Sequence, residues 1–381
     1  MKRLIITALA LAVIATGCIG SRDKGTPPEE PPAAENQKSA VETLLEGMTT
    51  EEKVGQLFMV GLEGTELDGD TAAFLKEHRI GGVILFGRNT QTPEQVSALT
   101  DGLQGLKSGP GGVGMLIGAD QEGGRVNRLP GENGKFPSAR EQAADNNPDK
   151  VKEVAAQMAL QLKEMGINLN FAPVMDIKSN PKNPVIGDRA FGDTPGVVTR
   201  MGMAFMKGTL EQGVISVAKH FPGHGDTGVD SHTDLPVITH SMDRLEDFEL
   251  VPFGEAIKNG LPAIMSAHIL LPEIDKDYPA TLSDSVINGI LRERMGFDGV
   301  VVSDDLDMGA ITGLYSPGEA AVRAIYAGVD MLLIGHSREG MLEAFDAVVT
   351  AVVEGDIAAD VIDKAVKRVL SLKEEFGLIE D

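Results

Sequence analysis

Short apolar segments alternate with longer amphipathic segments from about Val41 to the end of the chain. The apolar segments lie at 54–62, 80–87, 114–120, 167–177, 214–221, 263–272, 299–305 and 329–335. Nearly continuous apolar runs of this length are typical of parallel strands that helices cover on both faces. The first run is ambiguous, because Thr49 and Glu52 have the spacing of a helix capping box and part of 50–60 could be helical.

Amphipathic segments between the apolar runs predict the helices. Those at 149–166, 195–213 and 283–296 each end in glycine, which commonly follows a helix C-terminus. The segment 359–378 has the apolar spacing of a closing helix. Eight βα-like units predict an α/β protein built as a single (β/α)8 TIM barrel over residues 40–381. A doubly wound sheet is the alternative, although no glycine-rich dinucleotide fingerprint follows the first strand.

The N-terminus predicts export and a lipid anchor. Residues 1–17 have a basic start and an apolar stretch too short for a confident membrane span, as in a secretory signal peptide. Cys18, the only cysteine, follows in the sequence ATGC, which resembles the lipobox of bacterial lipoproteins. A simple signal peptide with an incidental cysteine is the alternative. Residues 18–39 continue as a Pro- and Glu-rich linker that cannot bury apolar surface. We expect an extracytoplasmic protein held to a bacterial membrane through Cys18.

Composition narrows the class of partner. The formal net charge is −23, which disfavours nucleic acid because phosphate contacts need clustered Lys and Arg. One cysteine cannot form an internal disulfide, so a packed core must stabilise the fold. The chain has no Trp and three Tyr, which argues against a long aromatic platform for a polysaccharide.

Polar residues gather where the predicted strands end, which is the functional edge of a TIM barrel. They are Asp120, Asp176, Lys219, His220, His268, Asp304, Asp305 and His336. Singly, each could be a turn cap or a satisfied core group. Their shared position on one rim favours a site there.

The segment 219–236, KHFPGHGDTGVDSHTDLP, concentrates histidine and aspartate on a backbone that glycine and proline interrupt. His220 and His224 have helical metal-ligand spacing, but Pro222 and Gly223 between them disfavour a helix, so we expect no metal. No G-x-S-x-G elbow is present, which disfavours a serine hydrolase. Asp230 and His232, two positions apart in extended backbone, can pair for acid–base chemistry. A hydrogen bond that only braces the loop is the alternative.

Four motifs together resemble glycoside hydrolase family 3. They are KHFPGHGDTGVDSHTDLP (219–236), GADQEGGRVNRL (118–129), GDRAFG (187–192) and VVSDDLDMGAI (301–311), in the order in which the family has them. Within the family the resemblance is to the β-N-acetylhexosaminidase branch that removes N-acetylglucosamine from peptidoglycan fragments. It runs from about Val41 to Asp381.

The resemblance implies a role for each of several residues. Asp304 would be the nucleophile, and alternation would turn its neighbour Asp305 to the other face. His232 would be the acid/base, with Asp230 as its partner. The sugar-binding positions would be Asp120, Arg128, Arg189, Lys219 and His220. Other residues of these motifs, namely Glu122, Arg125, His224 and Asp226, would support the site or form its loops.

The function implied is that of a retaining, exo-acting β-N-acetylglucosaminidase that needs no cofactor. Its substrate would be a small N-acetylglucosaminide such as a muropeptide or chitooligosaccharide. A β-glucosidase or xylosidase of the same family is one alternative. A lipid-anchored sugar-binding protein without catalysis is another, although it should show two lobes rather than eight evenly spaced units.

Overall fold

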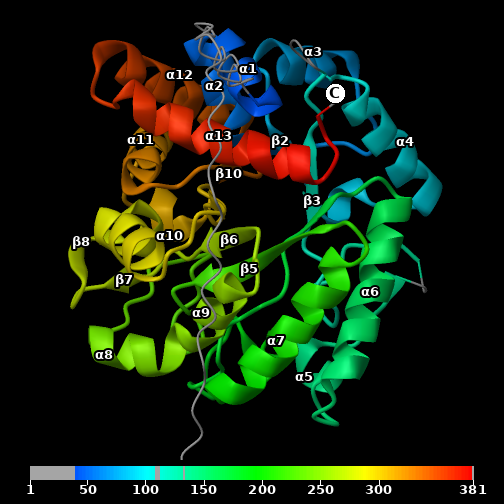
Figure 1. Ribbon diagram of the computed structural model, residues 1–381, viewed down its shortest axis with the longest axis vertical. Coiled ribbons are helices and arrows are strands. Elements are labelled where there is room, and N and C mark those ends of the chain that lie inside the picture. The colour runs from blue at the N-terminus through cyan, green and yellow to red at the C-terminus, as the bar shows by residue number, and fades with distance from the viewer. Residues whose placement is uncertain (1–38, 108–111, 132–133, 380–381) are drawn as a thin grey trace, which may run out of the picture. The chain divides into compact units, whose positions relative to one another are not determined.

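The computed structural model describes residues 39–107, 112–131 and 134–379 (Figure 1). The predicted signal peptide, the predicted lipidation site Cys18 and the linker up to Lys38 lie outside the described residues. Ser39 caps the first helix, α1 (Ala40–Gly47), through a reciprocal capping box with Glu42. Residues from Ser39 onward belong to one folded unit.

Eight parallel strands form the centre of this unit. They are β1 (Phe58–Gly61), β2 (Gly82–Leu85), β3 (Leu116–Ala119), β4 (Leu169–Asn170), β5 (Ile215–Phe221), β6 (Ala263–Ser266), β9 (Val300–Val302) and β10 (Leu332–Ile334). They pair in the order β10-β1-β2-β3-β4-β5-β6-β9. A parallel bridge from Val302 to Met331 joins β9 to the start of β10, and the Ser303 N–H donates to the Met331 carbonyl. The sheet therefore closes, and the prediction of a TIM barrel is confirmed over the doubly wound alternative.

Each of the eight predicted apolar runs contains one barrel strand, and the run at 54–62 contains a helix as well. Helix α2 (Thr50–Gln56) starts from the expected capping box of Thr49 and Glu52, and β1 begins two residues after it ends. The ambiguity in the sequence thus reflects a helix and a strand that follow each other closely. All residues of β2, β3, β5 and β6 are buried, as expected for strands covered by helices.

Helices surround the barrel (Figure 1). The remaining α-helices are α3 (Gly69–Glu77), α4 (Pro93–Gln104), α5 (Ala139–Gln142), α6 (Pro148–Glu164), α7 (Pro195–Leu210), α8 (Met242–Arg244), α9 (Val251–Lys258), α10 (Gly309–Thr312), α11 (Pro317–Ala327), α12 (Arg338–Glu354) and α13 (Ala359–Glu375). The predicted helices at 149–166, 195–213 and 359–378 correspond to α6, α7 and α13. Gly166, Gly213 and Gly296 all have positive φ, as expected of glycines that follow a helix.

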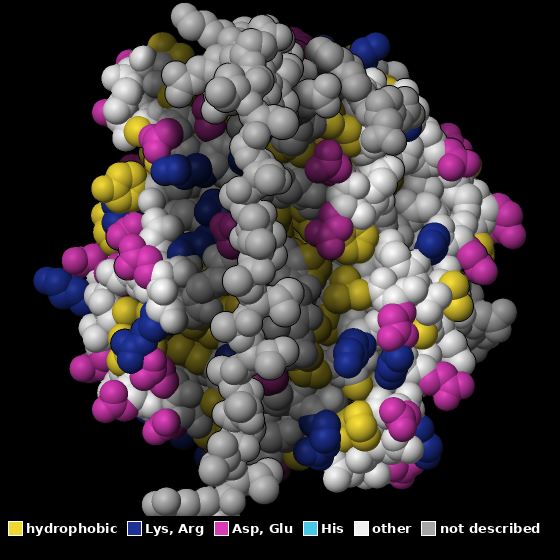
Figure 2. Space-filling view, viewed as in Figure 1, with side chains coloured by type: hydrophobic (Ala, Val, Ile, Leu, Met, Phe, Trp, Pro, Cys, Tyr) yellow, Lys and Arg dark blue, Asp and Glu magenta, His cyan; other side chains and the backbone are white. Residues whose placement is uncertain are grey.

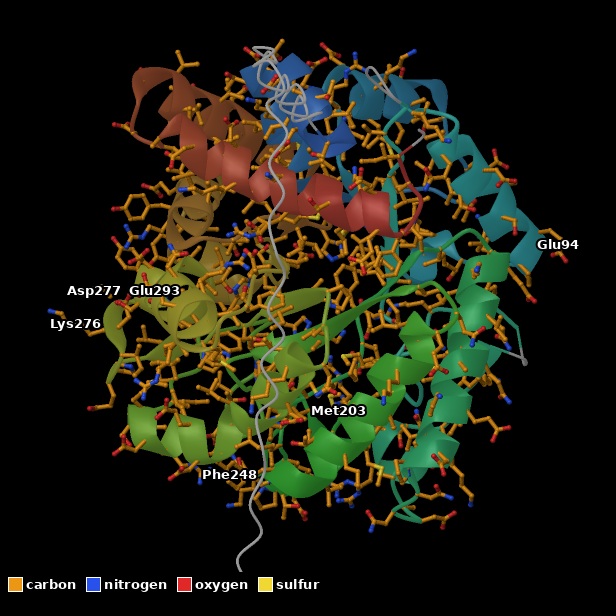
Figure 3. All side chains as sticks on the ribbon, in the orientation of Figure 1. Glu94, Met203, Phe248, Lys276, Asp277 and Glu293 are labelled. Carbon is orange, nitrogen blue, oxygen red and sulfur yellow. The ribbon has the colours of Figure 1, made fainter. Side chains whose placement is uncertain are left out.

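Two segments depart from the prediction. The run at 263–272 contains β6 and then β7 (Leu270–Leu271), which pairs antiparallel with β8 (Asp275–Pro279) in a small separate hairpin. The helix expected at 283–296 is the π-helical segment η6 (Ser285–Arg294). In Figure 3, Lys276 and Asp277 of β8 point outward from the barrel, as does Glu94 of α4.

Acidic side chains are spread over the visible surface, with Lys and Arg between them (Figure 2). This distribution agrees with the negative net charge of the chain. Among the described residues, no helix combines the length and the apolar character that crossing a bilayer requires.

Candidate active site

A cavity of about 450 Å³ opens at the C-terminal ends of the barrel strands. All eight residues predicted to act in catalysis or sugar binding line it, namely Asp120, Arg128, Arg189, Lys219, His220, Asp230, His232 and Asp304. The other residues around it include Phe86, Arg125, His224, Asp305, Asp307 and His336. The structure thus brings residues from four separate sequence motifs into one place, where their individual roles stay predictions.

Glu122 lies buried behind the charged wall of this cavity. Its carboxylate accepts two hydrogen bonds from Arg189, each 2.8 Å long, and lies 2.7 Å from the ammonium of Lys219. Lys219 also contacts Asp120 at 2.5 Å. Burial favours the neutral acid, but the charges of Arg189 and Lys219 hold the pKa of Glu122 well below its usual value. Two cations are therefore fixed at the cavity wall by a buried, ionised carboxylate.

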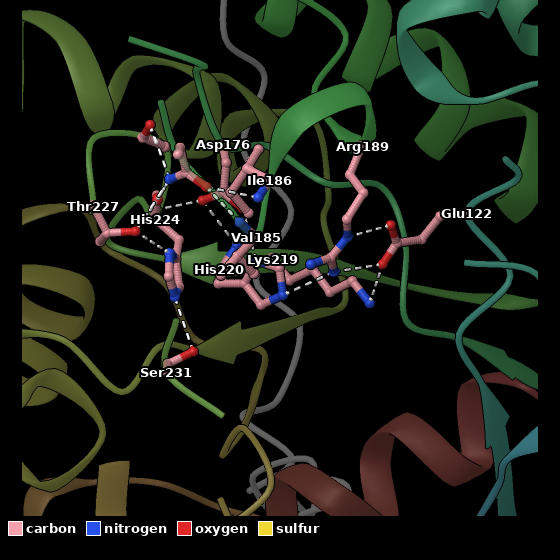
Figure 4. Close-up of polar contacts among 12 residues, drawn as sticks. Glu122, Asp176, Val185, Ile186, Arg189, Lys219, His220, His224, Thr227 and Ser231 are labelled. Atoms are coloured by element: carbon pink, nitrogen blue, oxygen red, sulfur yellow. Dashed lines mark hydrogen bonds and ion pairs between the residues drawn. The ribbon is translucent and has the colours of Figure 1, made fainter. Parts of the chain in front are cut away.

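Asp176 lies beneath the cavity and is completely buried. Its Oδ2 accepts a hydrogen bond of 2.6 Å from His220 Nδ1, and its Oδ1 accepts one of 2.6 Å from the backbone N–H of His224. Burial opposes ionisation, but the contacts with these two histidines hold the pKa of Asp176 below its usual value. Because a guanidinium only donates, His220 Nε2 accepts from Arg189 at 3.3 Å. Figure 4 shows the resulting chain of contacts from Glu122 to His224.

Asp304 lies two residues after the end of β9. Burial opposes its ionisation, but the imidazoles of His268 and His220, and the backbone N–H of Asp305 at 2.9 Å, hold the pKa of its carboxyl below the usual value. An ionised carboxylate in a cavity is the state that a nucleophile requires. His268 does not itself line the cavity, and it bonds Thr281 and the Asp305 carbonyl.

The expectation that Asp305 turns to the other face is wrong. Strand β9 ends at Val302, so the alternation of a strand no longer applies at this position. Asp305 lines the same cavity, with Oδ1 accepting from the backbone N–H of Gly335 and of Asp307. Burial raises the pKa of the Asp305 carboxyl to about 7 despite these two hydrogen bonds. Two adjacent carboxyl groups therefore have opposite pKa shifts.

Asp230 and His232 form the predicted pair on the loop that follows β5. Asp230 Oδ1 accepts from His232 Nδ1 at 2.8 Å and from the backbone N–H of His232 at 2.9 Å. Burial opposes ionisation of Asp230, but these hydrogen bonds lower the pKa of its carboxyl. Because Nδ1 is engaged by Asp230, Nε2 is the ring nitrogen that remains for proton exchange with a ligand. The His232 side chain is 63% exposed, as a group at the cavity mouth would be.

The loop after β3 is folded around the side chain of Gln121. Its Oε1 accepts from the backbone N–H groups of Arg128 and Leu129 at 2.8 and 3.1 Å. These contacts fix the backbone of Arg128, which lines the cavity. The buried Nε of Arg128 has no hydrogen-bond partner within the part of the chain that the structure describes. A donor of this kind is well suited to a polar ligand.

Within residues 39–107, 112–131 and 134–379, no group of three or more His, Cys, Asp or Glu side chains is arranged so as to hold a metal ion. Three carboxylates at the site pair instead with basic side chains, Glu122 with Arg189, Asp120 with Lys219 and Asp176 with His220. Its donor set is therefore suited to hydrogen bonding a polyhydroxylated ligand.

The family model described as the glycosyl hydrolase family 3 N terminal domain matches residues 49–372. The chain belongs to glycoside hydrolase family 3.

Known proteins and solved structures are similar to this chain. It is 38% identical over 287 residues to beta-hexosaminidase A of Pseudoalteromonas piscicida, covering 71% of this chain and 48% of that protein. The chain thus spans about half the length of that relative. It is 33% identical to beta-hexosaminidase LpqI of Mycobacterium tuberculosis, covering 97% of this chain and 96% of that protein.

A solved structure extends the comparison to three dimensions. The glycoside hydrolase family 3 beta-N-acetylglucosaminidase from Paenibacillus sp. str. FPU-7 has a TM-score of 0.85 and 43% sequence identity. The match covers 87% of this chain and 63% of that one. The sequence and the barrel of this chain therefore both place it among family 3 proteins.

Four residues expected to support the family 3 site differ in their positions. Glu122 is buried behind Arg189 and Lys219, whereas Arg125 and His224 line the cavity itself. Asp226 bonds His240 Nε2 at 2.8 Å and does not line the cavity.

Phe86, which follows β2 directly, was not among the residues predicted for the site. Its ring stacks on His336 with centroids 4.8 Å apart, and both residues line the cavity. Asp307, also missed, accepts from the backbone N–H of His336 at 2.8 Å. The signal that could have found Phe86 is its place directly after a strand, which marks aromatic residues at the rim as well as charged ones.

Proposed function

We propose that this chain is a retaining, exo-acting β-N-acetylglucosaminidase that removes terminal N-acetylglucosamine from peptidoglycan fragments or chitooligosaccharides. One observation carries the proposal: Asp304 and the Asp230–His232 pair line the same cavity at the strand ends. The names of the similar proteins, beta-hexosaminidase and beta-N-acetylglucosaminidase, support the sugar class. A nucleophile and an acid/base that share one cavity are what a double displacement needs.

The reaction proceeds in two steps. In the first, a carboxylate oxygen of Asp304 attacks the anomeric carbon as the bond to the leaving oxygen breaks. His232 gives its proton to that oxygen, and a glycosyl-aspartate ester remains. In the second, His232 takes a proton from water, the water oxygen attacks the same carbon, and the ester bond to Asp304 breaks. Both residues return to their starting states.

The charged wall of the cavity supplies the sugar contacts. Arg189 and Lys219 are held in place by Glu122, and they offer N–H donors at fixed positions. Asp120 provides a carboxylate acceptor beside Lys219. Arg128 and His220 complete the set of residues assigned to the sugar. Donors and acceptors fixed before binding lower the entropic cost of holding a ligand.

The cavity volume favours release of single terminal sugars. A space of about 450 Å³ is at the lower end of the range for small-molecule sites. The lack of Trp and the three Tyr in the sequence also argue against an extended binding groove. Digestion of an intact polymer into long internal fragments would contradict exo cleavage.

A fluorosugar experiment tests the assignment of Asp304. A slow fluorinated N-acetylglucosaminide should leave its mass on the peptide that contains Asp304, and Asp304→Ala should abolish both labelling and turnover. A label on any other residue, or full activity in Asp304→Ala, would overturn the mechanism.

Substrate comparison separates the alternatives. We expect release of the chromophore from an aryl N-acetylglucosaminide and little release from the matching glucoside or xyloside. The reverse preference would indicate a β-glucosidase or xylosidase, and binding without release would indicate a sugar-binding protein.

We also propose that Cys18 anchors the protein to a bacterial membrane from the extracytoplasmic side. The sequence of residues 1–39 supports this assignment. Expression in a bacterium that processes lipoproteins should place the full-length chain in the membrane fraction, and Cys18→Ser should release it. Equal membrane association of both proteins would contradict a lipid anchor.

A further inference from the structure

The loop that carries Asp230 and His232 is held from two sides at the residue between them. Ser231 is only 1% exposed although both of its neighbours are far more accessible. Its hydroxyl lies 3.0 Å from His224 Nε2. A buried contact at the central residue of an otherwise open loop points to a role in holding the loop.

His224 is itself fixed by several hydrogen bonds. Its backbone N–H donates to Asp176, and its Nδ1 contacts the hydroxyl of Thr227 at 2.9 Å. The side chain of Asn183 donates to the His224 carbonyl at 2.9 Å. Burial lowers the pKa of His224 to about 4. Its imidazole is therefore neutral near pH 7 and offers one donor and one acceptor, which the two hydroxyl groups can match.

On its second side, the loop is held by the segment that follows Asp304. The backbone N–H groups of Gly309 and Ala310 donate to the carbonyls of His232 and Ser231, each at 3.2 Å. A Cβ atom at Gly309 would lie 2.8 Å from the His232 carbonyl oxygen and 3.0 Å from that of Thr233. The loop therefore approaches α10 more closely than any residue other than glycine would allow.

These contacts join the nucleophile side and the acid/base side of the cavity. Asp304 lies five residues before Gly309, and the docked loop carries His232. Figure 4 shows that the hydrogen-bonded chain beneath the sugar-binding residues continues through His224 to Ser231. The loop is thus attached both to the frame that holds His220 and to the segment that carries Asp304.

We propose that Ser231, His224 and Gly309 form a docking point that positions His232 for proton transfer at the cavity. They act through the loop, and they are positioning residues rather than groups that react with substrate. The inference rests on the proposed function, since it assumes that His232 is the acid/base. A displacement of about 1 Å at a reacting group can cost about 100-fold in rate.

Two substitutions test the docking point from its two sides. Ser231→Ala removes the hydroxyl that contacts His224, and Gly309→Ala inserts a methyl group against the loop backbone. The matched control is Gly196→Ala in α7, where an added Cβ would meet no atom within 4 Å. The assay compares kcat/KM for an aryl N-acetylglucosaminide with kcat/KM for a chitooligosaccharide, whose leaving alcohol needs a proton.

Both variants should lose kcat/KM with the chitooligosaccharide by about tenfold or more, and by a much smaller factor with the aryl glycoside. Gly196→Ala should retain both values. Fluorosugar labelling of Asp304 should persist in both variants, because it needs no protonated leaving group. Equal losses on the two substrates, or no loss in Ser231→Ala, would overturn the docking role.

The result also separates this inference from the proposed function. If the unaltered protein neither cleaves the aryl N-acetylglucosaminide nor takes the label on Asp304, the proposed function fails and the docking role fails with it. If the unaltered protein does both, and the loss in Ser231→Ala is the same for both leaving groups, only the docking role fails. Should Gly309→Ala not fold, the Ser231→Ala comparison alone decides.

Discussion

Glu122 accepts two parallel hydrogen bonds from the guanidinium of Arg189, with the side chains only 3% and 11% exposed. A bidentate pair of this kind fixes both the position and the plane of the arginine. Since Arg189 also donates to His220 at 3.3 Å, the pair orients two of the residues assigned to the sugar. Glu122 itself lies buried behind these residues, where it supplies a negative charge and fixes the position of Arg189.

Glu122→Gln should damage both stability and sugar binding. The variant leaves Arg189 and Lys219 buried with one carboxylate fewer, and breaking a buried pair typically costs about 3–5 kcal/mol. We expect a loss of that order in the free energy of unfolding, measured by urea denaturation, and a raised KM for the N-acetylglucosaminide.

Glu211→Gln is the matched control for this substitution. Glu211 pairs with Lys152 at 2.7 Å on the surface, where both side chains are well exposed. Its loss should cost less than about 1 kcal/mol. Similar losses in the two variants would show that the burial of Glu122 is unimportant.

His232→Ala should reduce activity according to the leaving group. An alcohol needs a proton to depart, so kcat/KM for a chitooligosaccharide should fall by roughly 10²–10⁴-fold, whereas an activated aryl glycoside should lose far less. Asp230→Asn should also lose more kcat/KM with the chitooligosaccharide than with the aryl glycoside. Both losses should be smaller than in His232→Ala, because Asn can still accept the hydrogen bond from His232. Identical losses on both substrates would mean that His232 has only a structural role.

Asp305→Asn should change how stability depends on pH. The carboxyl of Asp305 has a pKa of about 7 in the folded protein, against about 3.9 in an unfolded chain. Because the pKa is higher in the folded state, the contribution of this carboxyl to stability is fully present below about pH 4 and is lost as the pH rises to about 7. The variant should therefore gain stability relative to the unaltered protein across this window, as urea unfolding at several pH values would reveal.

Asp243→Asn, an exposed substitution on α8, is the control for Asp305. Its stability curve should run parallel to that of the unaltered protein between pH 4 and 7. A parallel curve for Asp305→Asn as well would contradict the raised pKa.

Lys373→Met should stabilise the protein near neutral pH. Lys373 is 1% exposed on α13 and donates to Gln56 Oε1 at 2.7 Å, and burial lowers its pKa to about 7. Between about pH 7 and 10.4 the unfolded chain carries this proton and the folded chain does not, so stability should rise by about 1.4 kcal/mol per pH unit. Lys373→Met should remove that rise.

The control for this prediction is Lys367→Met on the same helix, where the lysine pairs with Glu42 at the surface. Thermal unfolding of the three proteins at pH 7 and pH 10 would measure the effect. The prediction is contradicted if Lys373→Met and the unaltered protein differ by the same amount at both pH values.

The sequence was sufficient to predict the barrel because each strand is a short apolar run with a distinct amphipathic segment after it. It also predicted the helix cap at Thr49, whose signal is local. The β7–β8 hairpin was hidden, since its first strand continues the apolar run of β6 without a change in composition. Local patterns of this kind cannot show where one apolar run serves two sheets.

The residues that line the candidate site were predictable from motifs, but the contacts that hold them in place were not. Asp176 contacts the backbone of a residue 48 positions later in the chain, and Glu122 bonds an arginine 67 positions away. Such contacts depend on how strands are ordered around the barrel. The position of Asp305 was mispredicted for a local reason, because the strand ended before the pattern was applied.

The buried carboxylate of Asp176 serves two neighbours at once. One of its oxygens accepts from the ring of His220, and the other accepts from the backbone N–H of His224, where the loop with the proposed acid/base begins. Replacing His220 in order to change the proposed sugar preference would therefore also disturb the backbone that carries the proposed acid/base. Substitutions at the rim, around the stacked rings of Phe86 and His336, would leave the contacts of Asp176 intact.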